Sequence, residues 1–117
     1  MTVTEAAKSI SGAIVAGAGE GASNEVRGGY ASDLLSDVMA NSGEGDLWIT
    51  MQRHINIVAV AELKGLAGIV LVNGRKPEED TAAKAEEKRI PIICTGLPAF
   101  EAAGILYGIG IRGRRPA

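Results

Sequence analysis

Three short apolar runs in the second half of the chain, residues 46–50, 68–72 and 90–94, each stop abruptly in a cluster of small and polar residues. Runs of this length, bounded by turn-forming residues, are typical of buried β-strands. If helices connect them, the strands are parallel neighbours, and their carboxyl ends meet at one edge of a sheet. Open α/β folds bind their ligands at that edge. The polar clusters that follow the three runs are residues 50–56, 73–77 and 95–98.

Helix signals separate the apolar runs. Ser32 and Asn56 are residue types that cap helix N-termini, and Gly65 is suited to end a helix. The sequence predicts helices at about 33–41, 56–64, 77–89 and 100–107, a first strand at 12–16, an edge strand or extended turn at 25–27, and one helical turn within 4–10. We therefore expect an α/β fold, a single three-layer domain with a mainly parallel sheet of four to five strands flanked by helices.

Size and composition agree with one folded domain. A chain of 117 residues is long enough to bury one core. We expect one domain over residues 1–117, with a core at about 10–111 and a flexible tail at 112–117. The single Cys94 cannot form an internal disulfide, and no signal peptide is recognisable, so a cytoplasmic location is expected.

Charge and hydropathy argue against two classes of partner. The formal net charge of -2 provides no attraction to nucleic acid or to anionic membrane. Four aromatic residues are too few for a base-stacking surface, and no apolar run approaches the roughly 20 residues that span a bilayer. We expect neither a nucleic-acid nor a membrane partner.

Six residues of the polar clusters, together with Asp33 at the start of the first main helix, are the candidate ligand-binding set. Thr50 and Asn56 would supply hydrogen bonds, Gly74 would allow close backbone approach, and His54 would make recognition sensitive to pH. The full set is Asp33, Thr50, His54, Asn56, Asn73, Gly74 and Thr95. A small anionic or nucleotide-like ligand is expected, because Arg75 and Lys76 precede a helix N-terminus. The alternative is a simple turn, which the acidic residues at 78–80 favour.

His54, the only histidine, has three interpretations: a turn or cap residue, a ligand contact, or a general base oriented by a carboxylate. No metal site is expected, since one histidine and one thiol make a poor ligand set. Cys94 lies within an apolar strand and is best interpreted as a core residue.

The glycine-rich segment 17–21 follows the first predicted strand and could cradle a phosphate. Its spacing matches neither the dinucleotide fingerprint nor a P-loop, and no Lys-Ser or Lys-Thr follows it. A plain flexible loop is the better interpretation.

Four segments together resemble the DRTGG domain family: 28–39, 45–50, 54–61 and 73–77. The similarity extends from about Ile10 to Ile111, and the string that names the family is present in part, at Arg27, Gly28 and Gly29. The resemblance implies a module that stands alone or is attached to CBS domains, to a CobQ/CbiA-like domain or to phosphate acetyltransferase. It also implies a fold similar to the N-terminal domain of HPr kinase, a name that freestanding members often bear.

The sequence therefore predicts a non-catalytic regulatory module that binds a small ligand, needs no cofactor and forms a homodimer. It lacks the P-loop that kinase chemistry requires. The alternative is a protein-interaction or dimerisation module without a small ligand, in which Leu34, Leu35 and Trp48 form the contact surface. An enzyme that uses His54 is a third interpretation.

Overall fold

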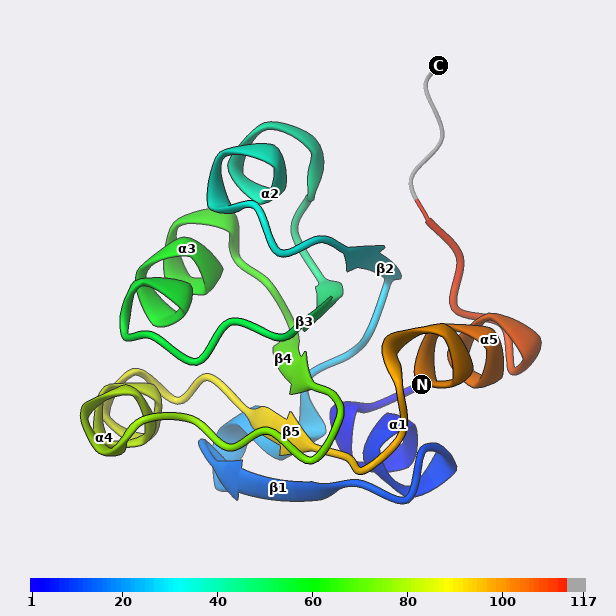
Figure 1. Ribbon diagram of the computed structural model, residues 1–117, viewed down its shortest axis with the longest axis horizontal. Helices are drawn as coiled ribbons and strands as arrows, with labels where there is room; N and C mark the ends of the chain where they lie inside the picture. The colour runs from blue at the N-terminus through cyan, green and yellow to red at the C-terminus, as the bar shows by residue number, and fades with distance from the viewer. Residues whose placement is uncertain (114–117) are drawn as a thin grey trace.

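A mixed five-stranded sheet forms the centre of the computed structural model, which describes residues 1–113 (Figure 1). The strand order is β1-β5-β4-β3-β2; β2 to β5 are parallel, and β1 pairs antiparallel with β5. The strands are β1 (Ala13–Ala16), β2 (Gly28–Ala31), β3 (Asp46–Thr50), β4 (Gly68–Leu71) and β5 (Ile92–Cys94). The helices are α1 (Val3–Ser9), η1 (Glu20–Ser23), α2 (Leu35–Asn41), α3 (Asn56–Lys64), α4 (Glu79–Lys88) and α5 (Ala99–Gly108).

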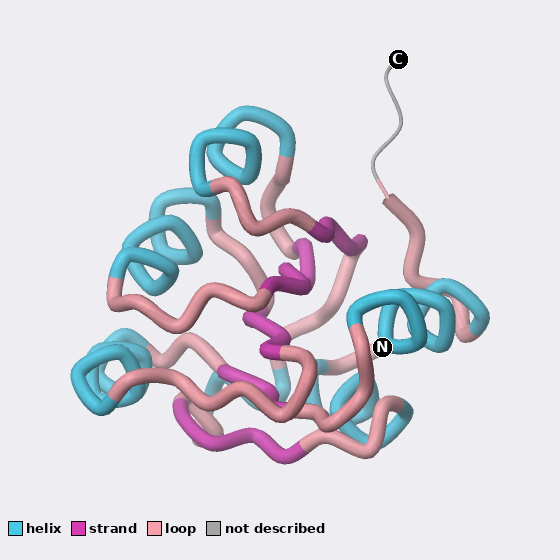
Figure 2. The backbone as a smooth tube through the Cα atoms, in the orientation of Figure 1, coloured by secondary structure: helices cyan, strands magenta, loops and turns pink. Residues whose placement is uncertain are grey.

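Helices cover both faces of the sheet, as Figure 2 shows by colour. On one face, α1 and α5 pack against alternate strand residues such as Leu47, Val70 and Ile93. On the other face, α2, α3 and α4 pack against the intervening residues, which include Trp48 and Ile69. The expected three-layer α/β architecture is confirmed, and it follows from strands that are apolar on both sides.

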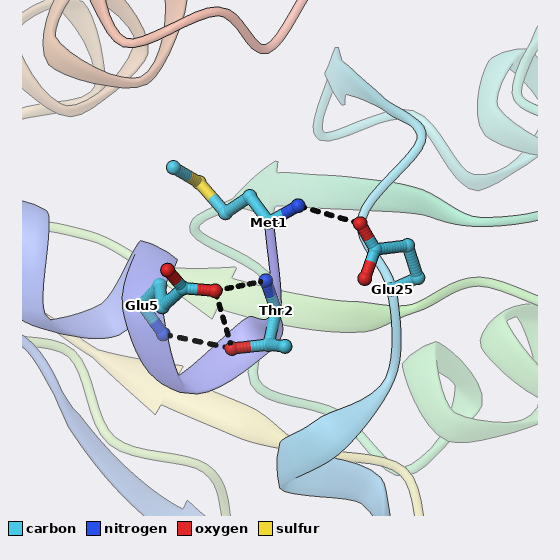
Figure 3. A network of polar contacts seen from close by, with 4 residues as sticks. All are labelled: Met1, Thr2, Glu5 and Glu25. Atoms are coloured by element: carbon cyan, nitrogen blue, oxygen red, sulfur yellow. Dashed lines mark hydrogen bonds and ion pairs between the residues drawn. The ribbon is translucent and has the colours of Figure 1, made fainter.

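Helix α1 is more regular than the predicted single turn. Its N-terminus has a capping box: Thr2 Oγ1 accepts from the Glu5 N–H at 3.3 Å, and the Glu5 carboxylate accepts from the Thr2 N–H at 2.9 Å (Figure 3). The Thr2 N–H, together with the Thr2 hydroxyl that donates to the same carboxylate oxygen at 3.1 Å, lowers the pKa of Glu5. The N-terminal ammonium also contacts Glu25 at 2.5 Å. The segment around residue 25 is thereby joined to the start of α1. An edge strand or an extended turn was expected at 25–27, and the structure forms only an isolated β-bridge there, between Thr2 and Glu25.

Strand β2 was not predicted, because two consecutive glycines are poor strand formers. Contacts with residues that are distant in the sequence explain the two glycines. A Cβ at Gly28 would lie 2.7 Å from the buried Asp46 carboxylate and 3.0 Å from the Arg112 carbonyl oxygen. The Gly29 N–H donates to that carbonyl at 3.0 Å, so the segment around Arg112 lies along the open edge of β2. The expected flexible tail thus begins with an ordered Arg112, and its residues 114–117 lie outside the described residues.

The predicted cap at Ser32 is wrong. Helix α2 begins at Leu35 with Leu34 as its N-cap residue, and no side chain caps it. Ser32 Oγ instead accepts from the Leu34 N–H at 3.1 Å, and Leu34 itself is extended, so the helix starts only after it. Gly65, by contrast, ends α3 in the predicted left-handed conformation.

Candidate functional site

The carboxyl ends of four parallel strands meet at one edge of the sheet. The register places Thr50 of β3 beside Leu71 of β4, and Leu71 beside Cys94 of β5. The loops after these strands therefore start side by side (Figure 1). We call this region the strand-end edge; it comprises residues 32–34, 50–56, 73–78 and 95–98. It contains the three polar clusters that follow the apolar runs.

Asp33 joins the first two loops of the strand-end edge. Its Oδ1 accepts hydrogen bonds from Thr50 Oγ1 at 2.8 Å and from the Met51 N–H at 2.7 Å. The Gln52 side-chain amide donates to the Asp33 carbonyl at 2.9 Å. Thr50 is only 2% exposed, and its hydroxyl also accepts from the Gln52 N–H at 3.2 Å. Asp33 and Thr50 are thus in direct contact, and the Thr50 hydroxyl positions the loop.

Asn73 and Gly74 form a tight turn after β4. Both have positive φ, 59° and 69°, which is the backbone of the turns that favour Asn-Gly. The Asn73 N–H donates to the Leu97 carbonyl and the Gly74 N–H to the Thr95 carbonyl, each at 2.9 Å. A Cβ at Gly74 would meet nothing within 4 Å, so its backbone conformation favours glycine here, as predicted. Since these amides are occupied, the exposed Asn73 side chain is the group of this turn that can reach a ligand.

The Asn73 side chain connects the turn to the Asp33 cluster. Its Nδ2 lies 3.4 Å from Met51 Sδ, and the Met51 N–H is bound to Asp33. A sulfur acceptor is weak, so this amide can exchange it for a better partner.

Thr95 serves the fold. It is 2% exposed; its hydroxyl donates to the Ile10 carbonyl at 2.7 Å and accepts from the Leu97 N–H at 3.2 Å. These bonds anchor the end of α1 to the loop after β5. We therefore assign Thr95 a positioning role and do not include its hydroxyl among the groups that face a ligand.

His54 and Asn56 contact each other, but Asn56 does not cap α3 as predicted. It is the first residue of α3, and its N–H donates to His54 Nδ1 at 3.3 Å. The imidazole thus satisfies a donor at the helix start, and in the neutral ring the proton is on Nε2. Asn56 lines a separate groove between α3 and α4, together with Val58 and Lys84. No hydrogen bond joins this pair to Asp33 within residues 1–113.

Sequence reasoning did not select Met51, Gln52 or Arg53, although all three lie in the first polar cluster. Arg53 ties the loop after β3 to the loop after β4: its Nε donates to the Lys76 carbonyl. Its own carbonyl accepts from the Thr81 hydroxyl at 2.8 Å. The polar cluster could have directed attention to these residues, but its residue pattern does not indicate which of them contact the neighbouring loops.

A pocket of about 230 Å³ opens at the strand-end edge, on the face of the sheet that α5 covers. It is lined by Ser32, Asp33, Thr50, Met51, Val72 and Ala99, among others. Ligand sites for drug-sized molecules have about 300–1,000 Å³, so this pocket can hold one part of such a ligand.

The strand-end edge carries charged side chains of both signs. No hydrogen bond or ion pair in the described part of the chain engages the side chains of Arg75 and Lys76, and both residues are exposed. Asp33 places a carboxylate in the pocket. Burial raises the pKa of the Cys94 thiol, and the nearby Lys76 ammonium partly opposes this rise. Cys94 is half-buried and packs against the core, so the prediction of a core residue is correct only in part.

The glycine-rich loop lies elsewhere and already binds a carboxylate. The Gly17 N–H donates to Glu86 Oε2 at 2.8 Å, and Glu20 pairs with Arg89 at 3.2 Å. An incoming phosphate would have to displace Glu86, which favours the interpretation as a plain loop.

Two further features are absent from residues 1–113. No group of three or more His, Cys, Asp or Glu side chains there could hold a metal ion. Nor is any helix of that range long and apolar enough to cross a membrane.

Comparison with protein families gives a match to the DRTGG domain over residues 5–109. The chain belongs to the DRTGG domain family. The match includes every predicted site residue and all strands of the sheet. Comparison with curated proteins gave no match.

Among solved structures, this DRTGG domain is similar to the CBS and DRTGG domains from the regulatory region of a Clostridium perfringens pyrophosphatase, crystallised with its activator diadenosine tetraphosphate. The TM-score is 0.65 at 14% sequence identity. The alignment covers 89% of this chain and 48% of that one, so the present chain spans about half of the regulatory region. At this sequence identity, the structural similarity shows a shared fold and no more.

Proposed function

We propose that this DRTGG domain is a non-catalytic regulatory module that binds a small anionic, nucleotide-like ligand at the strand-end edge. The observation that carries the proposal is a pocket lined by Asp33, Thr50 and Met51 from the first two strand ends, on the same edge of the sheet as the exposed and unpaired Arg75 and Lys76. Open α/β sheets bind ligands in this position. The fold-level neighbour is a regulatory region in complex with a nucleotide activator, which supports the same class of function.

The proposed contacts divide between the two chemical parts of a nucleotide. Arg75 and Lys76 suit a phosphate group, which cationic side chains bind with charge-assisted hydrogen bonds. The Asp33 carboxylate in the pocket would repel a phosphate but accepts hydrogen bonds from ribose hydroxyls. The Asn73 amide can give up its sulfur contact to a ligand oxygen. His54 would contribute a donor from Nε2 at the border of the site.

Isothermal titration calorimetry on the full chain with ATP, diadenosine tetraphosphate and inorganic pyrophosphate tests the proposal. Binding of at least one nucleotide is expected, and Lys76→Glu should weaken it at least tenfold. Lys64→Glu, which changes the net charge equally but lies in the last turn of α3, should leave affinity unchanged. No heat with any nucleotide, or equal loss in both variants, would contradict the proposal.

The second candidate is the interaction module, and it includes the predicted homodimer. One part of its predicted surface is wrong: Trp48 is fully buried, and its indole N–H donates to the Ser32 carbonyl at 2.8 Å. Leu34, 64% exposed, stays available. The observation that favours self-association is a group of exposed apolar side chains on α5, away from the predicted surface around Leu34.

A further inference from the structure

Helix α5 presents an uncovered apolar face. Nine large hydrophobic side chains are exposed within residues 1–113, and four of them come from 100–109. Phe100 is 87% exposed, Tyr107 52%, Ile109 43% and Ile105 38%. The inner side of the same helix, with Ala102 and Leu106, packs on the sheet. Helix α5 lies at the margin of the fold, and no other helix of residues 1–113 covers its outer side (Figure 1).

Two glycines lie within this outer face. Gly104 and Gly108 are one helical turn apart, on the same side as Phe100 and Tyr107. Glycine is less favourable than alanine inside a helix, and a Cβ at either position would meet nothing within 4 Å. Packing within the chain therefore does not require these glycines. A second backbone that approaches the helix closely would require them.

The face also carries opposite charges at its two ends. Glu101 lies in the first turn of α5. At the other end, the Arg112 guanidinium stacks on the Tyr107 ring with 4.0 Å to its centroid and donates to the Tyr107 carbonyl. Two copies of the helix in antiparallel contact would place Glu101 of each beside Arg112 of the other. A parallel contact would instead place like charges and like helix ends together.

We propose that a second copy of this chain docks on the outer face of α5, with the two α5 helices antiparallel about a two-fold axis that passes between Gly104 and Gly108. The charges at the two ends of the face are self-complementary in this arrangement, as an isologous interface requires. Gly104 of one copy faces Gly108 of the other, and Phe100 of one copy covers Tyr107 and Arg112 of the other. A single helix pair is smaller than a standard interface of about 800 Å² per partner, so the dimer is expected to be weak.

This inference builds on the homodimer of the second candidate function and assigns its surface; it is independent of the ligand. Sedimentation equilibrium of the full chain over a hundredfold concentration range measures it. The apparent mass should rise from the monomer value of 12.0 kDa toward twice that value as concentration increases.

Substitutions in α5 test whether the dimer forms through this helix. Phe100→Glu and Gly104→Gln should each raise the dimer dissociation constant at least tenfold. Gly104→Gln should raise the thermal midpoint of the monomer, because glutamine is the better helix former. The matched control is Leu63→Glu, which places the same charge at a 74% exposed position on α3 and should leave the dissociation constant unchanged.

Charge reversal tests the antiparallel arrangement. Glu101→Arg and Arg112→Glu should each weaken the dimer, and the double variant should recover most of the affinity. A strictly monomeric wild type would overturn both the homodimer and this surface. A dimer that is insensitive to Phe100→Glu and Gly104→Gln would overturn the α5 surface alone, and absence of rescue in the folded double variant would overturn the antiparallel pairing.

Discussion

Asp33→Ala should lower the free energy of unfolding, by an amount that follows from the two hydrogen bonds that Asp33 Oδ1 accepts. Oδ1 accepts from the Thr50 hydroxyl at 2.8 Å and from the Met51 N–H at 2.7 Å. In the variant the exposed Met51 amide can bond to water, whereas the Thr50 hydroxyl is 2% exposed and loses its acceptor. A buried donor without a partner costs about 1–3 kcal/mol, and we expect the free energy of unfolding to fall by that amount.

A double-mutant cycle with Thr50→Val separates this contact from other effects of the substitution. The two positions should couple by about 1 kcal/mol, since the second change costs less once the first has removed the hydrogen bond. Urea unfolding followed by Trp48 fluorescence suits the measurement, because this single tryptophan is fully buried and its indole donates to the Ser32 carbonyl. The denaturant slope should stay constant across the cycle.

Additivity of the two substitutions to within about 0.3 kcal/mol would refute the reasoning, because sites that do not interact behave in this way. The strand-end loops would then not be held by Asp33, and the pocket they line would lose its structural basis.

Three further predictions concern packing, ionisation and reactivity. Gly28→Ala should lower stability by about 1–3 kcal/mol, since its Cβ would lie 2.7 Å from a carboxylate oxygen, whereas Gly96→Ala should change the urea midpoint little. The Tyr30 hydroxyl donates to Asp37 at 2.8 Å, which raises the pKa of Tyr30, so its contribution to stability is present below pH 10 and is lost as pH rises through the folded-state pKa. In a tyrosine NMR titration, Asp37→Asn should lower that pKa. Burial raises the pKa of Cys94, and its reaction with a disulfide reagent at pH 7 should be markedly slower in the folded than in the urea-unfolded protein.

The buried strands could be predicted because their signal is local. Strands β3, β4 and β5 are apolar on both faces, so each segment is recognisable without knowledge of the others. Strand β2 could not be predicted, since Gly28 is explained by the Asp46 carboxylate and the Arg112 carbonyl, and Gly29 by the Ile111 side chain, all distant in sequence.

The location of the candidate site was predictable, but the role of each side chain was not. Parallel strands bring their carboxyl ends together whatever the loops contain, so the clusters had to meet. Whether a hydroxyl faces solvent depends on partners that no local pattern specifies. Thr95 donates to the carbonyl of Ile10, a residue from the opposite end of the chain, and the imidazole of His54 accepts the N–H of Asn56.

The most direct test of the proposed ligand site is a two-dimensional amide NMR titration of the full chain with ATP. We predict that chemical-shift changes concentrate at 32–34, 51–54 and 73–76, and that they saturate with one affinity. Changes confined to the opposite edge of the sheet, around Arg27 and Lys88, or no saturable change at millimolar nucleotide, would contradict the proposal.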